Sequence, residues 1–187
     1  MRVIAGKFGS RTLKTLKGMS LRPSSDRLRE TLFNVLGPVV KDSLFVDCYA
    51  GSGAVGIEAL SRGAREAIFI EDHGPAVNLI QKNLESLQIA KGVEVLKMDA
   101  LRGLEELSDR RLLPDFIFLD PPYAETREYF RILEFIGSAH LLAPEGRIIA
   151  EHSRRIQLPG FLDDLEQTRV ITQGDAALSF YSLSLAA

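Results

Sequence analysis

The sequence has 187 residues, no long hydrophobic run and a single cysteine. Its longest uninterrupted apolar runs, Ala67–Ile70 and Phe116–Leu119, have four residues each, far fewer than the roughly 18 that a membrane-spanning helix needs. No apolar core of a signal peptide occurs within Met1–Ser20, so we predict neither a membrane span nor secretion. Because Cys48 is the only cysteine, an internal disulfide is impossible, which fits a reducing, cytoplasmic setting.

The chain also lacks internal repeats, low-complexity tracts and linkers rich in proline, glycine and serine. With 45% hydrophobic and 26% charged residues, its composition is close to that of average soluble globular proteins, which excludes a disordered or fibrous chain. The length fits one domain of ordinary size. We expect residues 1–40 to form a basic hairpin and helix packed on a core of residues 41–187, in one structural unit and as a monomer.

Acidic and basic residues nearly balance, but the net charge of −2 hides an uneven distribution. Residues 1–30 hold eight Lys or Arg and two acids, which gives +6, whereas the remaining 157 residues hold 15 basic and 23 acidic groups, which gives −8. A basic segment of this kind either binds the phosphates of a nucleic acid or is a solvated edge of the surface. Charge alone leaves both interpretations open.

Hydrophobic patterning predicts alternating strands and helices after an N-terminal segment of a different kind. Residues 2–15 are expected to form two short strands around Gly6–Gly9, followed by a helix from Ser24 or Ser25 to Gly37-Pro38. The expected strands are then Leu44–Cys48, Ala67–Glu71, Val93–Met98, Asp115–Asp120, Arg147–His152, Val170–Gln173 and Leu178–Leu183. The expected helices are Ala54–Arg62, Pro75–Leu87, Ala100–Leu107, Arg127–Ala139 and a weaker one at Leu158–Leu165.

This alternation predicts an α/β fold with a doubly wound, Rossmann-like sheet that is mostly parallel and covered by helices on both faces. The last two strands follow each other closely, so we expect them to form an antiparallel pair at one edge. In such sheets ligands bind beyond the C-terminal ends of the strands. Four successive predicted strands end at or beside an acid, and these acids are Asp47, Glu71, Asp99 and Asp120.

Residues 47–56 read DCYAGSGAVG and contain the pattern G-x-G-x-x-G between a strand and a helix. The pattern is typical of a dinucleotide-binding loop, although a plain tight turn has the same spacing. Asp47 favours S-adenosylmethionine, because a carboxylate repels a pyrophosphate and attracts a cationic cofactor. The loop amides would bind the methionine carboxylate and Glu71 the ribose hydroxyls. Asp99-Ala100 would face the adenine, unless Asp99 is simply an exposed acid.

Asp120-Pro121-Pro122-Tyr123 ends the fourth predicted strand and is the most specific signal in the chain. Two prolines cannot continue a central strand, so they form a rigid corner at the edge of the sheet. There the Asp120 carboxylate and the Pro121 carbonyl match the two N–H donors of an exocyclic amine, and Tyr123 can stack on an extruded base. A carboxyl with its ordinary pKa is a poor acceptor for the amine proton, so positioning and desolvation are expected to carry most of the acceleration. The alternative is a proline-rich turn without catalytic function.

From end to end the chain resembles the bacterial methyltransferases of the RsmD family, which methylate N2 of one guanine in 16S ribosomal RNA. The segments that carry the resemblance are Arg2–Gly6, Arg22–Asn34, Asp47–Gly63, Phe118–Tyr123, Glu151-His152 and Ala177–Tyr181. The block R-P-x-x-D-R-x-R-E-x-L-F-N in residues 22–34 points to this family, whereas the glycine loop and D-P-P-Y occur in other amino-methyltransferases as well. Tyr49 stands where the family often has Phe.

The resemblance implies an S-adenosylmethionine-dependent enzyme with a defined set of site residues. The implied cofactor contacts, with two neighbouring alanines added, are Asp47, Ala50, Gly51, Ser52, Gly53, Glu71, Asp99 and Ala100. The implied catalytic residues are Asp120, Pro121, Pro122 and Tyr123. Candidate contacts to RNA phosphates in the basic segment are Lys7, Arg11, Arg22 and Arg27. No metal is expected, because the three histidines have no ligand spacing with Cys48 or with one another.

We therefore expect a cytoplasmic methyltransferase that acts on guanine N2 of 16S rRNA in the small ribosomal subunit. A DNA adenine-N6 or other nucleic-acid amino-methyltransferase is the main alternative, although DNA enzymes usually carry a recognition region for which this length leaves no room. An NAD-dependent oxidoreductase is disfavoured by Asp47 and by the lack of a residue suited to hydride chemistry. A non-catalytic RNA-binding module would not explain a cofactor loop combined with D-P-P-Y.

Overall fold

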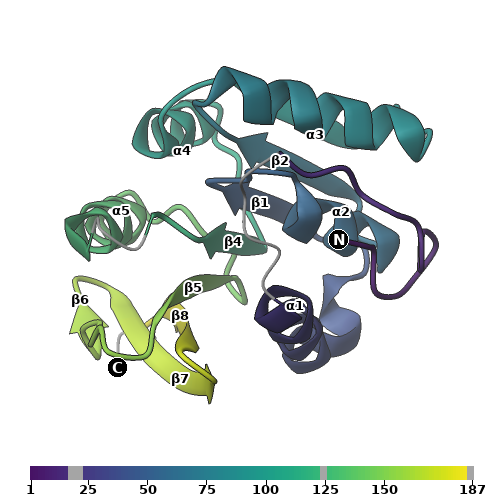
Figure 1. Ribbon diagram of the computed structural model, residues 1–187. Helices are drawn as coiled ribbons and strands as arrows, with labels where there is room; N and C mark the ends of the chain where they lie inside the picture. The colour runs from purple at the N-terminus through teal and green to yellow at the C-terminus, as the bar shows by residue number, and fades with distance from the viewer. Residues whose placement is uncertain (17–22, 123–125, 185–187) are drawn as a thin grey trace.

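The computed structural model describes residues 1–16, 23–122 and 126–184, the side chains of 23–25 excepted, and contains one eight-stranded sheet (Figure 1). The strand order is β3-β2-β1-β4-β5-β8-β7-β6. The strands are β1 Leu44–Cys48, β2 Glu66–Ile70, β3 Val93–Leu96, β4 Phe116–Leu119, β5 Arg147–Ser153, β6 Phe161–Leu162, β7 Leu165–Gln173 and β8 Ala176–Leu183. Strands β1 to β5 are parallel and β6 to β8 are antiparallel. This arrangement confirms the predicted α/β class.

Helices cover both faces of the sheet (Figure 1). They are α1 Pro23–Leu36, α2 Ala54–Ser61, α3 Gly74–Ser86, α4 Ala100–Asp109 and α5 Thr126–Ser138, with a short 3-10 helix at Gly37–Val40. Helices α4 and α5 pack on one face and α1, α2 and α3 on the other. No helix within the described ranges is long and apolar enough to cross a membrane.

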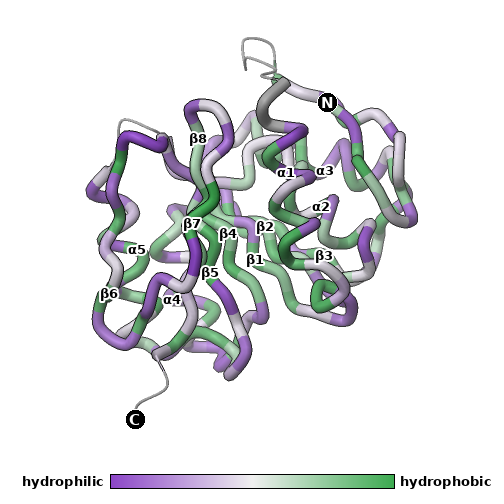
Figure 2. Tube along the Cα trace, turned by 90° about the horizontal axis from the view of Figure 1, so that it is seen from below, coloured by the Kyte–Doolittle hydropathy of each residue, from purple (hydrophilic) through white to green (hydrophobic). Residues whose placement is uncertain are grey.

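The short apolar runs of the sequence become strands that are buried on both faces. Ala67–Ile70 lies in β2 and Phe116–Leu119 is β4, and the apolar colour of the central strands in Figure 2 reflects this burial. Alternate residues point to opposite faces, so Ile117 packs towards α5 and Phe118 towards α1. Because β1 lies between β2 and β4, the strand order reverses at β1, where this fold class binds its ligands.

The helix expected at Leu158–Leu165 is wrong, because this segment contains β6 and the start of β7. Leu162 pairs with Leu165 across a two-residue turn, in which Asp163 has a φ of 49°. A residue in this left-handed region ends a helix and suits a hairpin turn. The predicted antiparallel edge is therefore correct but has three strands, and the helical pattern was too short to exclude a strand.

The two short strands expected in residues 2–15 are reduced to a short hairpin in the described segment, residues 1–16 (the N-terminal arm). Arg2 and Thr12 form an isolated antiparallel bridge, and the N–H groups of Val3 and Leu13 donate to the Arg11 and Met1 carbonyls at 2.9 and 3.0 Å. The backbone N–H groups of Ile4 and Ala5 instead donate to the carboxylate of Glu58 on α2, at 2.7 and 3.1 Å. The predicted hairpin is therefore present at its base, and beyond it the buried acid of α2 takes the place of the partner strand.

Candidate active site

The glycine loop after β1 has the backbone conformation that its sequence predicts. Gly51 and Gly53 both have positive φ, 55° and 75°, and the Gly53 N–H donates to the Ala50 carbonyl at 2.7 Å, which closes a tight turn before α2. Gly56 has a different role, since a Cβ there would lie 2.4 Å from the ring of Phe69. The first two glycines of the pattern therefore shape the loop, and the third lets α2 pack closely on β2.

Asp47 lies beneath the loop, and its side chain is buried, with 2% exposure. Its Oδ2 accepts the Gly56 N–H at 2.8 Å and so holds the first turn of α2. Burial raises the pKa of Asp47 to about 8, partly offset by this hydrogen bond and increased by the charges of Asp120 and Glu71. The structure thus gives Asp47 a structural contact, while its attraction to a cationic cofactor stays a prediction.

Glu71 links the end of β2 to the glycine loop. Its Oε2 accepts the Gly51 N–H at 2.7 Å, and its Oε1 accepts the His73 N–H at 2.9 Å. Both carboxylate oxygens are therefore positioned by backbone groups, and the structure brings the predicted acid to the predicted loop.

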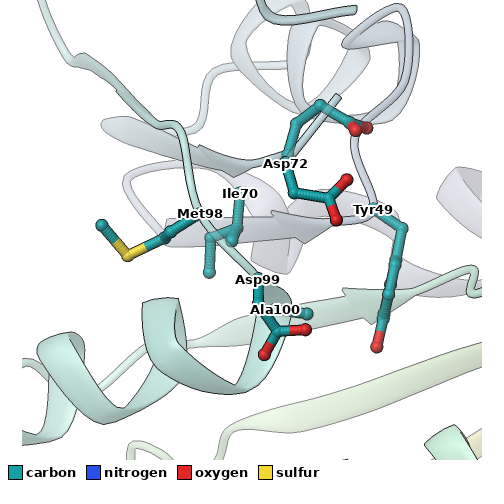
Figure 3. A pocket seen from close by; sticks show the side chains of 7 residues that line it. Tyr49, Ile70, Asp72, Met98, Asp99 and Ala100 are labelled. Atoms are coloured by element: carbon teal, nitrogen blue, oxygen red, sulfur yellow. The ribbon is translucent and has the colours of Figure 1, made fainter. Parts of the chain in front are cut away.

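A pocket opens beside Glu71 at the ends of β1, β2 and β3 (Figure 3). Its lining residues are Tyr49, Ile70, Glu71, Asp72, Met98, Asp99 and Ala100. Asp99 caps α4, because its Oδ1 accepts the Leu101 N–H at 3.0 Å. The pocket thus offers acceptors for hydroxyl and amine groups beside the apolar side chains of Ile70 and Met98. This combination suits an adenosine group, which has ribose hydroxyls, an amine and a flat apolar ring. The residues present fit the predicted cofactor.

A polar network that the sequence did not reveal connects the rim of this pocket to α5. The Tyr49 hydroxyl donates to Glu128 Oε1 at 2.6 Å, Glu128 pairs with Arg131, and Arg131 Nη2 lies 3.3 Å from Asp99 Oδ2. The single hint in the sequence was Tyr49 in place of the more frequent Phe, since only Tyr supplies the hydroxyl.

Ser52, also predicted to contact cofactor, is buried at 6% exposure, and its carbonyl accepts the Asn83 Nδ2 at 2.9 Å. Asn83 is fully buried on α3 and also exchanges hydrogen bonds with the backbone of Lys14 at 2.8 and 3.1 Å. This asparagine therefore ties the N-terminal arm to the glycine loop. A lone polar residue on an apolar helix face was its only sequence signal.

The D-P-P corner lies where the sequence predicts it, directly after β4. Asp120 is partly buried and its carboxyl has no hydrogen-bond partner among the residues that the structure describes. Burial raises the pKa of this carboxyl above its usual range. Pro121 is buried and Pro122 exposed, whereas Tyr123 lies outside the described residues.

Three predicted RNA contacts are exposed, and one lies outside the described residues. Lys7 and Arg11 on the arm and Arg27 on α1 are accessible, although Arg11 Nη2 also donates to the Ser86 carbonyl at 3.3 Å. Arg22 is not among the described residues. Their exposure is compatible with both interpretations of the basic segment, an RNA-binding surface and a solvated edge.

The fold and site define a class, that of the S-adenosylmethionine-dependent methyltransferases with the class I fold. Among solved structures, "Putative methyltransferase yhhF from Escherichia coli" superimposes with a TM-score of 0.84 at 30% identity, covering 100% of this chain and 99% of that chain. The likeness spans the whole sheet, including its antiparallel edge.

The sequence profile of the family described as conserved hypothetical protein 95 matches residues 1–182. A Bacillus subtilis protein named "Putative rRNA methyltransferase YlbH" is 39% identical over 181 residues, which cover 97% of this chain and 98% of that protein. The Escherichia coli "Ribosomal RNA small subunit methyltransferase D" is 35% identical over 183 residues, covering 97% and 89%. The chain therefore belongs to this family of RsmD-like methyltransferases.

Proposed function

We propose that the protein transfers the methyl group of S-adenosylmethionine to the exocyclic N2 of a guanine in 16S rRNA of the small ribosomal subunit. The observation that carries the proposal is the Asp120 carboxyl, which lies directly after β4, the strand next to β1, without a partner in the described ranges. The name of the Bacillus subtilis relative supports an rRNA substrate, and that of the Escherichia coli relative supports the small subunit.

The cofactor would be held by residues from the ends of three strands. Glu71 would accept the ribose hydroxyls, and the glycine loop at the positive N-terminal end of α2 would bind the methionine carboxylate. Ile70 and Met98 would contact the adenine ring, with Asp99 beside its amine. When bound, S-adenosylmethionine supplies a methyl group on a positively charged sulfur, which leaves as a neutral thioether.

The chain contributes positioning and a proton acceptor. Asp120 and the Pro121 carbonyl would accept the two N2–H groups and so direct the nitrogen lone pair towards the methyl carbon. An exocyclic amine that has received a methyl group would carry a positive charge and would have to lose a proton. Because burial raises the pKa of Asp120, its carboxylate accepts this proton better than a carboxylate in water would.

The exposed cations of the N-terminal arm would bind RNA phosphates and orient the substrate without reading its sequence. Lys7 and Arg11 lie on the segment that Glu58 and Asn83 fix to α2 and α3, so their positions are tied to those of the glycine loop.

The direct test incubates the protein and labelled S-adenosylmethionine with small ribosomal subunits from a strain that lacks its gene. We expect label on one guanine of 16S rRNA, recovered as N2-methylguanosine after digestion. Label in DNA, on adenine or on a ring nitrogen would contradict the proposal. Calorimetry with S-adenosylhomocysteine and NAD tests the cofactor separately, and a preference for NAD would contradict it.

A further inference from the structure

The ends of β4 and β5 bring a second acid, Glu151, beside Asp120. The two strands are parallel, and their last paired residues are Leu119 and Ala150, so Asp120 and Glu151 follow side by side. Since side chains alternate along a strand and Phe118 packs on the α1 side of the sheet, Asp120 also points to that side. Paired positions share a face, so Glu151 does the same.

These two carboxyls differ from the other acids around the site in their lack of partners. Asp47, Glu58 and Glu71 each accept at least one backbone N–H, whereas Asp120 and Glu151 accept no hydrogen bond from any described residue. Burial raises the pKa of both, and the charge of Asp120 raises that of Glu151 further. Two unpaired carboxyls are costly to keep side by side, which is typical of a functional site.

A buried cation on α1 acts on Glu151 from the side of the sheet to which both carboxyls point. Arg29 is 4% exposed, and its positive charge lowers the pKa of Glu151 and of Asp47. Its Nη2 donates to the Arg2 carbonyl at 2.6 Å, while its Nε has no hydrogen-bond partner in the described part of the chain. The charge of Arg29 partly offsets the upward shift of the Glu151 pKa that burial and Asp120 cause, and within the described residues Arg29 forms no hydrogen bond with this carboxyl that would compete with a ligand.

We propose that Glu151 determines the base specificity of the reaction, by accepting the ring N1–H of guanine while Asp120 accepts the adjacent N2 amine. The inference rests on the proposed function. Among the RNA bases that carry an exocyclic amine, only guanine has a ring N–H next to it, whereas adenine and cytosine present a lone pair there. Two neighbouring carboxylates therefore match guanine and repel the other two bases.

The test compares guanine with 2-aminopurine at the methylated position of reconstituted small subunits, because 2-aminopurine keeps the 2-amine and lacks N1–H. We expect the wild type to prefer guanine by about 100-fold or more in kcat/KM. In Glu151→Gln, whose amide both donates and accepts, we expect this ratio to fall by about 10-fold or more. Glu145→Gln is the matched control, since this acid is exposed in the turn before β5, and should leave the ratio unchanged.

An unchanged ratio in Glu151→Gln overturns the inference even if the absolute rate falls, because a structural role slows both substrates alike. The melting temperature and the affinity for S-adenosylhomocysteine show whether the variant is folded. If it is not, Glu151→Asp replaces it and should keep the preference for guanine at a lower rate, so that loss of the preference overturns the inference. A wild type that methylates no guanine amine refutes the proposed function itself, which is a distinguishable result.

Discussion

The two halves of the C-terminal edge of the sheet differ in whether their acidic side chains form hydrogen bonds with the backbone. In the half proposed to bind the cofactor (the cofactor half), at the ends of β1, β2 and β3, the carboxylates of Asp47, Glu71 and Asp99 all accept backbone N–H groups. In the half proposed to bind the substrate (the substrate half), at the ends of β4 and β5, the carboxyls of Asp120 and Glu151 accept none from the described residues. The cofactor half is thus organised by internal bonds, whereas the substrate half keeps its acceptors free.

This difference separates two ways of using a buried acid. A carboxylate bonded to the backbone fixes a loop and recovers part of its desolvation cost. An unbonded carboxylate recovers nothing until a ligand supplies donors, so it lowers the stability of the free protein in exchange for function. The two halves should therefore respond differently to substitution, to pH and to removal of surface charge.

The largest effect is expected for Asp120→Ala in the substrate half. Methyl transfer should fall by about 1,000-fold or more, because both the amine acceptor and the proton acceptor are lost. The affinity for S-adenosylhomocysteine should stay within about 3-fold of wild type, since Asp120 does not line the pocket of the cofactor half. Single-turnover kinetics and calorimetry check the two results, and a parallel loss of affinity would show that the halves are not separate.

The next effect is expected for Asp47→Ala in the cofactor half. The Gly56 N–H would lose its acceptor, so the free energy of unfolding should fall by about 1–3 kcal/mol and the affinity for S-adenosylhomocysteine by about 10-fold. Urea unfolding and calorimetry measure both quantities.

Asp47→Asn is the matched variant, because its amide oxygen still accepts the Gly56 N–H. Stability and affinity should both stay near wild type. An asparagine variant that is stable but binds weakly would show instead that the charge of Asp47 acts on the cofactor, as the sequence predicted.

A smaller effect is expected from pH. The pKa of Asp47 in the folded protein is raised to about 8, and the pKa values of Asp120 and Glu151 are raised as well. At a pH between the unfolded and folded pKa values, the native state therefore binds more protons than the unfolded state. Stability is therefore greatest on the acid side of this window and falls as the pH rises through the folded pKa values. From about pH 6.5 to about pH 8.5 we expect the melting temperature to fall by about 5 °C.

Glu151→Gln sharpens this measurement, because it removes one of the two adjacent carboxyls. The charged groups that act on Glu151 are Asp120 and Arg29, and both also act on Asp47. The fall in melting temperature over the same range should be smaller than in wild type, and the variant should be more stable at the alkaline end. An identical pH profile in both proteins would mean that the unpaired acids do not lower stability.

The smallest effect is expected for the double variant Lys7→Gln, Arg11→Gln on the N-terminal arm. RNA affinity should fall several-fold and the slope of its logarithm against log salt should decrease by about 1.4, since each phosphate contact on a single strand contributes about 0.7. Cofactor affinity should not change.

Arg111→Gln with Arg169→Gln is the control for charge alone, because both exposed residues lie away from α2 and α3, which hold the arm: Arg111 is in the loop before β4 and Arg169 is in β7. If both double variants lower the salt slope equally, the arm is a solvated basic edge rather than an RNA-binding surface.

Much of the cofactor half was predictable, because its parts are local in sequence. The strand Leu44–Cys48 was predicted with its observed limits, and the glycine loop and the start of α2 follow within a few residues. A loop between a buried strand and a helix has few possible conformations, so glycine spacing was sufficient. The D-P-P corner was predicted for the same reason, since two prolines end β4 without help from the rest of the fold.

Contacts between distant segments were not predictable. The bond between Tyr49 and Glu128 joins residues far apart in sequence, and Glu58 bonds the N-terminal arm across a similar distance. The expected strands of the arm are limited to a short paired segment for this reason, because a carboxylate on α2 satisfies the N–H groups of Ile4 and Ala5 that a partner strand was expected to satisfy. The helix expected at Leu158–Leu165 failed because a short apolar pattern fits both a helix and a strand.

The sequence by itself determined the order of strands and helices from β1 to β5, the glycine loop, the D-P-P corner and the acids at four strand ends, because each depends on neighbouring residues. Only the tertiary structure decided which of those acids are free. Asp47, Glu71 and Asp99 are bonded to backbone groups, whereas Asp120 lies next to Glu151 without a partner among the described residues. The physical reason is strand register: pairing of β4 with β5 sets which side chains are adjacent, and that pairing joins segments that are about 30 residues apart.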